Sequence, residues 1–176
     1  AFENESRLVG EDIQTGGTTT ITNDGRDFGV ARLLYESASG DGRRSIGYLG
    51  TLATSDSLDA VVHGIDTHWM SSGGRWSIDN QLMASEKADT NGYGLFMDLS
   101  YTPTLGLSHS LGIDALDENL DISDLGYLRT NDSYGLSYSL MATESQDLPS
   151  WLRYRTLGLF LRANQNGDGY LNRGYA

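Results

Sequence analysis

Residues 92–101 read Gly-Tyr-Gly-Leu-Phe-Met-Asp-Leu-Ser-Tyr, and this stretch decides the fold. From Tyr93 to Tyr101 every second residue is large and apolar, and the residues between them are mostly Gly, Asp or Ser. Successive side chains of a β-strand point to opposite faces, so a period of two produces one apolar face and one small, polar face. The stretch therefore predicts a β-strand with two unlike faces.

Two later runs repeat this alternation, residues 105–115 and residues 134–143, and Thr102-Pro103-Thr104 marks a turn before the first of them. The runs are about 9–11 residues long, which is the length that a tilted strand needs to cross a bilayer. Their polar positions hold Gly and Ser rather than Lys and Glu, which suits the wall of a wide barrel facing water or a plug. The sequence therefore predicts an all-β fold, an antiparallel up-and-down transmembrane β-barrel of the bacterial outer membrane.

The alternation also predicts which residues face lipid and which face the lumen. The large apolar positions of the three runs are expected to face lipid: Leu95, Met97, Leu99, Leu107, Leu111, Leu136 and Leu140. Charged residues at the other parity are expected to line the lumen: Arg32, Glu36, Asp66, His68, Asp98 and Asp114. In a lumen such charges could bias the passage of ions or hold a plug. A purely structural ladder of charges across neighbouring strands is an equal alternative.

Four earlier segments carry the same alternation and are separated by short turns rich in Gly and Ser: residues 29–37, 45–54, 60–70 and 76–85. A longer polar loop is expected at residues 86–91. A last strand is expected at residues 151–163, where Arg153 and Arg155 share a face with the leucines that follow and indicate a bulge. Aromatic residues near strand ends could form interfacial girdles, although Tyr and Trp are also common in strands generally: Tyr35, Trp69, Trp76, Tyr93, Tyr101 and Tyr134.

Two parts of the chain differ in how clearly they are patterned. Residues 1–27 are predicted to be a poorly patterned N-terminal segment or a partial strand, and residues 28–176 to hold the strands and loops of the barrel. About eight strands could close a small barrel alone, but we favour an arc of a larger one. Because Ala1 begins no signal peptide and the chain stops at Ala176 in what reads as a strand, we expect a piece of a longer protein.

Composition excludes several classes of protein. The net charge of -12 would repel a nucleic-acid backbone, so no nucleic-acid partner is expected. The chain has no Cys, which excludes a disulfide scaffold and Cys-ligated metals. No apolar run approaches the roughly 18 residues of a transmembrane helix. The mean hydropathy of -0.38 fits a soluble protein and a barrel equally, because half of each barrel strand faces water.

Several short patterns suggest chemistry, but none is specific. Residues 164–169 read Asn-Gln-Asn-Gly-Asp-Gly and resemble the start of an EF-hand loop, yet its position 12 falls on Tyr175, which cannot supply the bidentate carboxylate. A plain turn is favoured there. His63 and His68 are five residues apart, so in a strand they point to opposite faces and cannot ligate one metal. His68 shares its face with Asp66, where a hydrogen bond in the lumen is expected.

Paired carboxylates are the other candidates for chemistry, either Asp114 with Asp117 or Asp121 with Asp124. Such pairs can serve as a general acid and base, but carboxylates in so acidic a chain are mostly solvated. No nucleophile elbow, phosphate loop or dinucleotide fingerprint is present. We therefore predict a protein that is not an enzyme, with no catalytic residues, no metal and no cofactor.

The stretch 117–132, Asp-Glu-Asn-Leu-Asp-Ile-Ser-Asp-Leu-Gly-Tyr-Leu-Arg-Thr-Asn-Asp, resembles a signature of an uncharacterised bacterial family. That family combines a C-terminal outer-membrane β-barrel with an N-terminal carbohydrate-binding module similar to family 9. The matching residues are Asp121, Asp124, Gly126, Tyr127, Leu128, Arg129, Asn131 and Asp132. Tyr127 stands where Phe is common, and Thr130 where a second Arg is usual. The resemblance covers roughly residues 28–164 and implies a barrel, a missing N-terminal module and no known reaction.

Two functional hypotheses follow from these observations. The first is part of an outer-membrane barrel with a pore, anchoring or surface carbohydrate-related role, whose partners are membrane lipid and, through the missing module, carbohydrate. The alternative is a soluble secreted β-sandwich that binds carbohydrate through its Tyr- and Trp-rich faces. They differ in what covers the apolar side chains: lipid in the first, a second layer of protein in the other.

Overall fold

The computed structural model describes residues 2–3, 6–11, 18–23, 25–55, 59–124, 126, 128 and 130–175, and in them the chain is all-β. The strands are β1 (Phe2–Glu3), β2 (Ser6–Glu11), β3 (Thr18–Asn23), β4 (Arg26–Ser39), β5 (Gly42–Thr54), β6 (Asp59–Ser71), β7 (Trp76–Lys87), β8 (Thr90–Thr104), β9 (Leu107–Leu116), β10 (Ser133–Glu144), β11 (Arg155–Gln165) and β12 (Leu171–Tyr175). Within this described part, no helix is long and apolar enough to cross a membrane.

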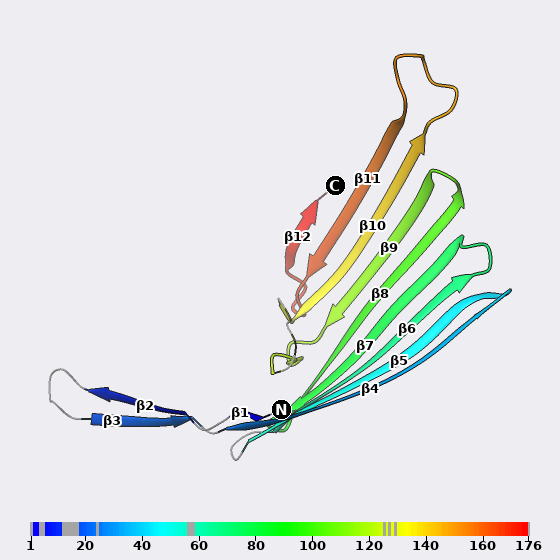
Figure 1. Ribbon diagram of the computed structural model, residues 1–176. Helices are drawn as coiled ribbons and strands as arrows, with labels where there is room; N and C mark the ends of the chain where they lie inside the picture. Colours follow the sequence, from blue (N-terminus) through cyan, green and yellow to red (C-terminus); the bar gives the residue numbers. More distant parts are fainter. Residues whose placement is uncertain are drawn as a thin grey trace.

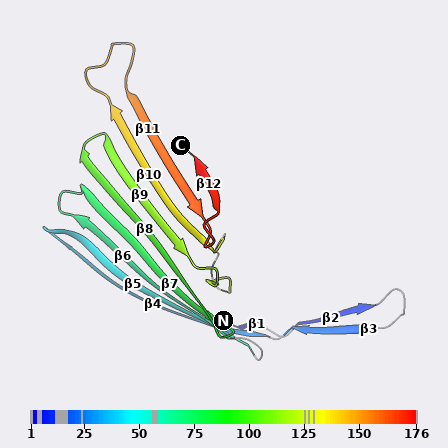
Figure 2. The same cartoon turned by 180° about the vertical axis from the view of Figure 1, so that it is seen from behind.

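Ten of these strands form one antiparallel sheet in the order β1-β4-β5-β6-β7-β8-β9-β10-β11-β12, and β2 and β3 form a separate hairpin. From β4 to β12 each strand pairs with the next one in the chain, so the predicted antiparallel meander is confirmed. The sheet is open: both views place β4 at one margin and β12 at the other (Figures 1 and 2). The eight strands from β4 to β11 are 10 to 15 residues long.

The two ends of the sheet carry different connections. One end, here called the loop rim, carries the β9–β10 loop, residues 117–132, and the two-residue turn between β7 and β8. The opposite rim carries the turn at residues 40–41, the turn at residues 72–75, and the longer connection at residues 145–154. Figure 1 shows the β9–β10 loop at the same end of the sheet as the start of β4.

The strand register divides the side chains into two faces, because directly paired residues point the same way. Across four strands, Leu82, Leu95, Ala115 and Tyr134 are successive partners, and they belong to the apolar face. In the described residues no second sheet covers this face, and many of its large side chains are exposed: Leu33, Tyr35, Ile46, Leu52, Ile65, Trp69, Trp76, Leu82, Tyr93, Tyr134, Leu136, Leu157, Leu159 and Leu161.

The buried side chains lie on the other face, the polar face, at the loop rim. Leu120 of the β9–β10 loop is only 1% exposed. The other buried side chains among the described residues are small or belong to strand ends at this rim: Ala53, Ala60, Ser85, Leu116 and Ser133. The molecule therefore has a small core at one end of its polar face and leaves its apolar face open.

The turn predicted at Thr102-Pro103-Thr104 is wrong. β8 continues to Thr104, which pairs with Leu107, and the chain reverses at Leu105–Gly106. Gly106 has a φ of +85°, a value that Gly adopts without steric cost. The register shifts between Tyr101 and Thr104, which accommodates Pro103 because proline has no N–H to donate to a ladder.

The polar loop predicted at residues 86–91 is also wrong. β7 runs to Lys87, β8 begins at Thr90, and Ala88 and Asp89 alone form the turn. Their φ values are +50° and +61°, as in the type I′ turns that match the twist of paired strands. Ala is a poor residue for positive φ, so the sequence carried no usual signal for this turn.

The last predicted strand, at residues 151–163, begins only at Arg155. β10 and β11 pair without interruption from Glu144↔Arg155 to Tyr134↔Gln165, so the bulge expected here is absent. The leucines of β11 therefore lie on the apolar face. Arg155 shares their parity but sits at the rim, where its guanidinium forms an ion pair with Glu144.

Candidate functional site

All six residues predicted to line a lumen lie on the polar face. Their cross-strand partners establish this: Arg32↔Leu49, Glu36↔Ser45, Asp66↔Gln81, His68↔Asp79, Asp98↔Gly112 and Asp114↔Gly135. The seven residues predicted to face lipid all lie on the apolar face, as their own partners show: Leu95↔Leu82, Met97↔Ile113, Leu99↔Leu111, Leu107↔Ala142, Leu111↔Tyr138, Leu136↔Ala163 and Leu140↔Leu159. The alternation thus separates the two sets onto opposite faces.

Aspartates on the polar face lie over glycines of the neighbouring strand. Asp66 is the direct partner of Gly47, and a Cβ built on Gly47 would lie 2.5 Å from its carboxylate. Asp114 covers Gly135 in the same way, with 2.4 Å to a built Cβ. Any larger residue would displace these carboxylates, so glycine here allows an acidic side chain to lie flat across the sheet.

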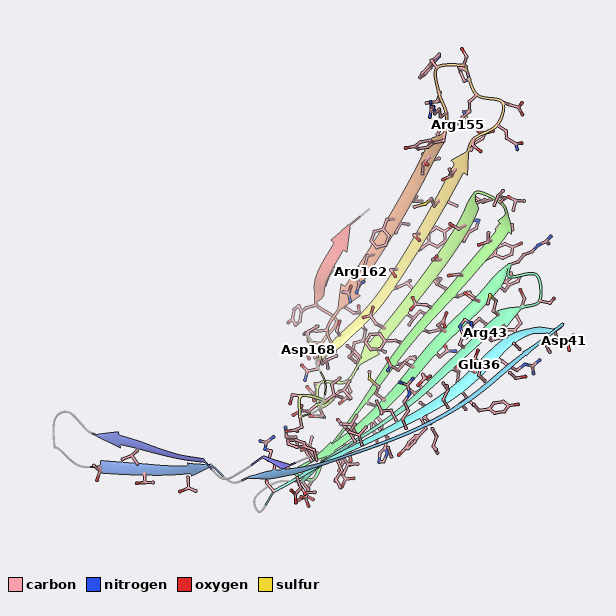
Figure 3. All side chains as sticks on the ribbon, in the orientation of Figure 1. Glu36, Asp41, Arg43, Arg155, Arg162 and Asp168 are labelled. Atoms are coloured by element: carbon pink, nitrogen blue, oxygen red, sulfur yellow. The ribbon has the colours of Figure 1, made fainter. Side chains whose placement is uncertain are left out.

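The space over Gly135 lets Asp114 reach across β10 to β11. Arg162 donates to Asp114 Oδ1 at 3.2 Å and also to Asn164 Oδ1 at 2.6 Å. Asn164 in turn donates to Asp114 Oδ2 at 3.3 Å and to Ser133 Oγ at 3.2 Å. Three strands are therefore joined by one polar cluster, and Figure 3 shows Arg162 within β11.

Two further charge pairs lie on this face. His68 Nδ1 is 2.5 Å from Asp79 Oδ1, so the predicted hydrogen bond of His68 goes to Asp79 of β7 rather than to Asp66. Glu36 pairs with Arg43 at 2.6 Å across the β4–β5 hairpin, where Figure 3 shows both side chains. Most charges on the face are thus matched between neighbouring strands, as in a structural ladder.

The β9–β10 loop crosses the polar face and is held there by charges. Lys87 Nζ, at the end of β7, is 2.9 Å from Asp121 Oδ2 and 2.9 Å from Asp124 Oδ2. Asp124 also forms an ion pair with Arg26, at the start of β4. The backbone N–H of Asp121 donates to Ser85 Oγ at 3.0 Å. The loop therefore reaches from β9 over to β7 and β4.

Leu120 anchors the loop in a recess formed by glycines. A Cβ built on Gly92 would lie 2.2 Å from the backbone nitrogen of Leu120, so the loop backbone rests directly on β8. A Cβ built on Gly94 would lie 2.8 Å from the Leu120 side chain and 3.2 Å from that of Leu116. Burial of a complete leucine side chain contributes about 2 kcal/mol relative to exposure.

Asp121 is held in its charged form by several donors. The Ser123 hydroxyl and the Ser123 backbone N–H, the latter at 2.9 Å, both donate to Asp121 Oδ1, and Lys87 lies on the other oxygen. These interactions, the Ser123 hydroxyl foremost, lower the pKa of Asp121 from 3.8 to about 2. Its carboxylate is therefore ionised at every ordinary pH.

Other residues of the predicted signature fasten the ends of the loop. Asn131 donates to the Glu118 carbonyl at 2.5 Å, and Asp132 accepts from the Gly167 backbone N–H at 2.7 Å. Gly126 and Leu128 belong to the loop without a strand assignment, and Tyr127 and Arg129 lie outside the described residues. Asp121, Asp124, Asn131 and Asp132 thus share one role, which is to fix this loop against the sheet.

The remaining chemical candidates are occupied by structural contacts. Asn166 accepts from the Tyr170 N–H through its side-chain oxygen at 2.8 Å, so the EF-hand-like segment is a turn between β11 and β12. His63 and His68 lie on opposite faces, as predicted, and Tyr48 bonds His63 at 2.8 Å. In the described residues no group of three or more metal-ligating side chains comes together.

Sequence reasoning missed the residues that hold the loop from the sheet. Lys87 was the only lysine of the chain, but the acidic partners on which it acts are 34 and 37 positions away in the sequence. Leu120 was an isolated apolar residue in an acidic stretch, which is a weak sign of an anchor. Arg162 was placed within an apolar strand without a partner being identified.

Comparison of the chain with models of protein families, with curated proteins and with solved structures produced no match. The resemblance of residues 117–132 to a barrel-family signature therefore stays a prediction.

Proposed function

We propose that this chain is part of the wall of a β-barrel in a bacterial outer membrane, with its apolar face toward lipid and its polar face toward a water-filled lumen. The observation that carries the proposal is the apolar face itself, which spans the long strands and is uncovered in the described structure. A patch of this kind is costly in water, because soluble monomers rarely expose contiguous apolar patches larger than a few hundred Å². Lipid is the environment that removes that cost.

Aromatic residues border the apolar face near both rims. Trp76, Tyr101 and His109 stack in a row across β7, β8 and β9, with ring centroids 4.0 Å and 6.1 Å apart. Tyr93 lies at the other end of β8, eight residues from Tyr101, which is roughly 27 Å along a strand. At a tilt of about 40° this corresponds to about 21 Å of height, close to the roughly 25 Å apolar band between the aromatic girdles of known barrels.

The apolar face also has the relief that acyl chains can fill. A shallow hollow of about 520 Å³ lies near the loop rim between Tyr93 and Tyr134, where Ala84 and Ala115 replace larger residues. Its lining consists almost entirely of apolar-face side chains, with Asp117 at the edge. Flexible hydrocarbon fits such an uneven surface without a matched protein partner.

The polar face supports a lumen that is wider than that of the smallest barrels. In barrels of about eight strands, side chains alone fill the interior. Here the β9–β10 loop lies over the polar face and needs further room on that side. An arc of a larger barrel, with a pore, anchoring or surface carbohydrate-related role, accommodates the loop. The carbohydrate role rests only on the family resemblance and its N-terminal module.

The three tryptophans provide a direct test of the orientation. Trp69 and Trp76 belong to the apolar face, whereas Trp151 lies in the exposed connection between β10 and β11. The test uses variants that retain one tryptophan each, refolded into vesicles whose lipids carry bromine on the acyl chains. We expect quenching of Trp69 and Trp76 fluorescence and little quenching of Trp151.

The control is the same set of variants in vesicles without bromine, which measures the unquenched signal. Equal and weak quenching of all three tryptophans, with the protein monomeric and soluble in buffer, would rule out the membrane wall. Specific binding of a sugar by that soluble material would instead support the carbohydrate-binding sandwich.

A further inference from the structure

We propose that Lys87 is the positioning residue that holds the β9–β10 loop across the polar face, and that it thereby sets the width of the passage along this face. The second half of this inference rests on the proposed function, since only a lumen has a passage to narrow. The first half concerns the chain alone and is testable without a membrane.

The loop takes a longer path than its ends require. Leu116 at the end of β9 and Ser133 at the start of β10 are direct partners, so a short turn could join the two strands. Instead the loop crosses β8 and reaches Lys87 on β7, two strands from β9. Asp124 then contacts Arg26 on β4, five strands from β9. An interaction with the sheet must keep the loop on this path.

Lys87 occupies the centre of that interaction. It contacts both Asp121 and Asp124 through one ammonium group, which carries three donors. Among the described residues, Arg26 is the other cation paired with these two aspartates. Without the charge of Lys87, two carboxylates would share a single cation, and their mutual repulsion would favour release of the loop.

The sheet beneath Lys87 is built from small residues. Ala60 is the direct partner of Lys87, and Ala53 is the partner of Ala60. Both alanines are almost completely buried. Their small size leaves space in which the lysine stem can lie over the polar face toward Asp124. The apolar stem and the charged head thus have separate roles, covering the alanines and binding the loop.

Detachment of the loop would uncover Ser85 and empty the space above β7 and β8. Ser85 is 4% exposed, and its hydroxyl accepts from the backbone of Asp121. Gln81 lies on the same strand and the same face, four positions away, and is exposed. The two residues therefore report on the loop and on the uncovered face respectively.

The chain has no cysteine, so a single introduced thiol reports its own accessibility. The test measures the rate at which a bulky maleimide modifies Ser85→Cys in the folded full chain, with Gln81→Cys as the matched control. We expect slow modification of Ser85→Cys alone. Adding Lys87→Met, which keeps the stem but removes the charge, is expected to raise the rate about tenfold, equivalent to about 1.4 kcal/mol of attachment.

Lys87→Arg should restore slow modification of Ser85→Cys, because it keeps the positive charge, and no Lys87 variant should change the rate at Gln81→Cys. A merely structural role of the lysine stem would leave the Lys87→Met rate unchanged, and that result would overturn the positioning role. A rise at Gln81→Cys as well would show general unfolding and would also overturn it.

The passage is tested separately by ion conductance across planar bilayers. Lys87→Met is expected to increase the single-channel conductance, and Lys87→Arg to leave it at the original value. Equal conductance of the three proteins, or no conductance from any of them, would overturn the claim about the passage. The tryptophan quenching experiment would still decide independently whether the sheet faces lipid.

Discussion

Leucines on the two faces of the sheet have opposite environments. On the apolar face Leu33, Leu136 and Leu157 are 71%, 53% and 70% exposed, whereas on the polar face Leu116 and Leu120 are almost completely buried. The polar face covers its leucines with its own β9–β10 loop, while in the described residues the apolar face has no protein cover. The comparison indicates that the apolar face depends on an external environment and the polar face does not.

The largest effect is expected from a charge placed on the apolar face. Leu111 lies between Leu99 and Tyr138 on this face, and Leu111→Arg should destabilise the bilayer-folded protein by about 2–4 kcal/mol. Ser110→Arg is the matched control, because Ser110 is adjacent in sequence but points to the polar face. Urea titration of protein folded in vesicles measures both. Equal losses would remove the distinction between the faces.

Truncation of the buried anchor should have the next largest effect. Leu120→Ala is expected to reduce the free energy of unfolding by about 2 kcal/mol, because it removes a buried side chain from the glycine-lined recess. Leu105→Ala serves as the control, since Leu105 is completely exposed in the β8–β9 turn. If denaturant titration gives the same small change for both variants, the loop contributes no core.

The carboxylates lying over glycines predict a smaller but selective effect. Gly135→Ala places a Cβ within 2.6 Å of Asp114 and Asn164, so it should cost about 1–2 kcal/mol. Gly158→Ala on the same face meets nothing within 4 Å and should change stability little. Denaturant titration compares the two variants. Similar values for both would show that the Asp114 cluster has no fixed position.

The smallest effect concerns pH. The pKa of Asp121 is lowered from 3.8 to about 2, so its contribution to loop attachment is complete above pH 4 and declines as the pH falls toward 2. Exchange protection of the Ser123 amide, which donates to Asp121, should decrease across this window. Asp121→Asn should abolish the pH dependence. Protection that stays constant from pH 4 to pH 2 in the original protein would contradict the assignment.

The strands were largely predictable because side-chain alternation is a local property. Tyr93 to Tyr101, and the runs at residues 29–37 and 60–70, were recognised from their period of two. Local errors arose where one residue overrode the pattern: Ala88 adopts a positive φ that its side chain disfavours, and Pro103 was taken for a turn inside β8. Both errors moved strand ends without changing the facing of the strands.

The candidate site was predictable only in part. Asp121, Asp124, Asn131 and Asp132 were selected as a group, but their role was not, because their partners come from distant strands. The 98 positions between Arg26 and Asp124 contain no pattern that would pair them. Charge pairs of this kind depend on how the curved sheet brings strand ends together, which periodicity does not describe.

The sequence by itself determined the order of the strands, their antiparallel pairing with sequence neighbours and the division of side chains into two faces. These features follow from the two-residue period of extended chain and from short turns, which act over a few residues. Only the tertiary structure decided that residues 117–132 fold onto the polar face, with Leu120 in a recess and Lys87 between two aspartates. That arrangement depends on contacts between strands two to five places apart in the sheet, and such distances exist only once the sheet has formed.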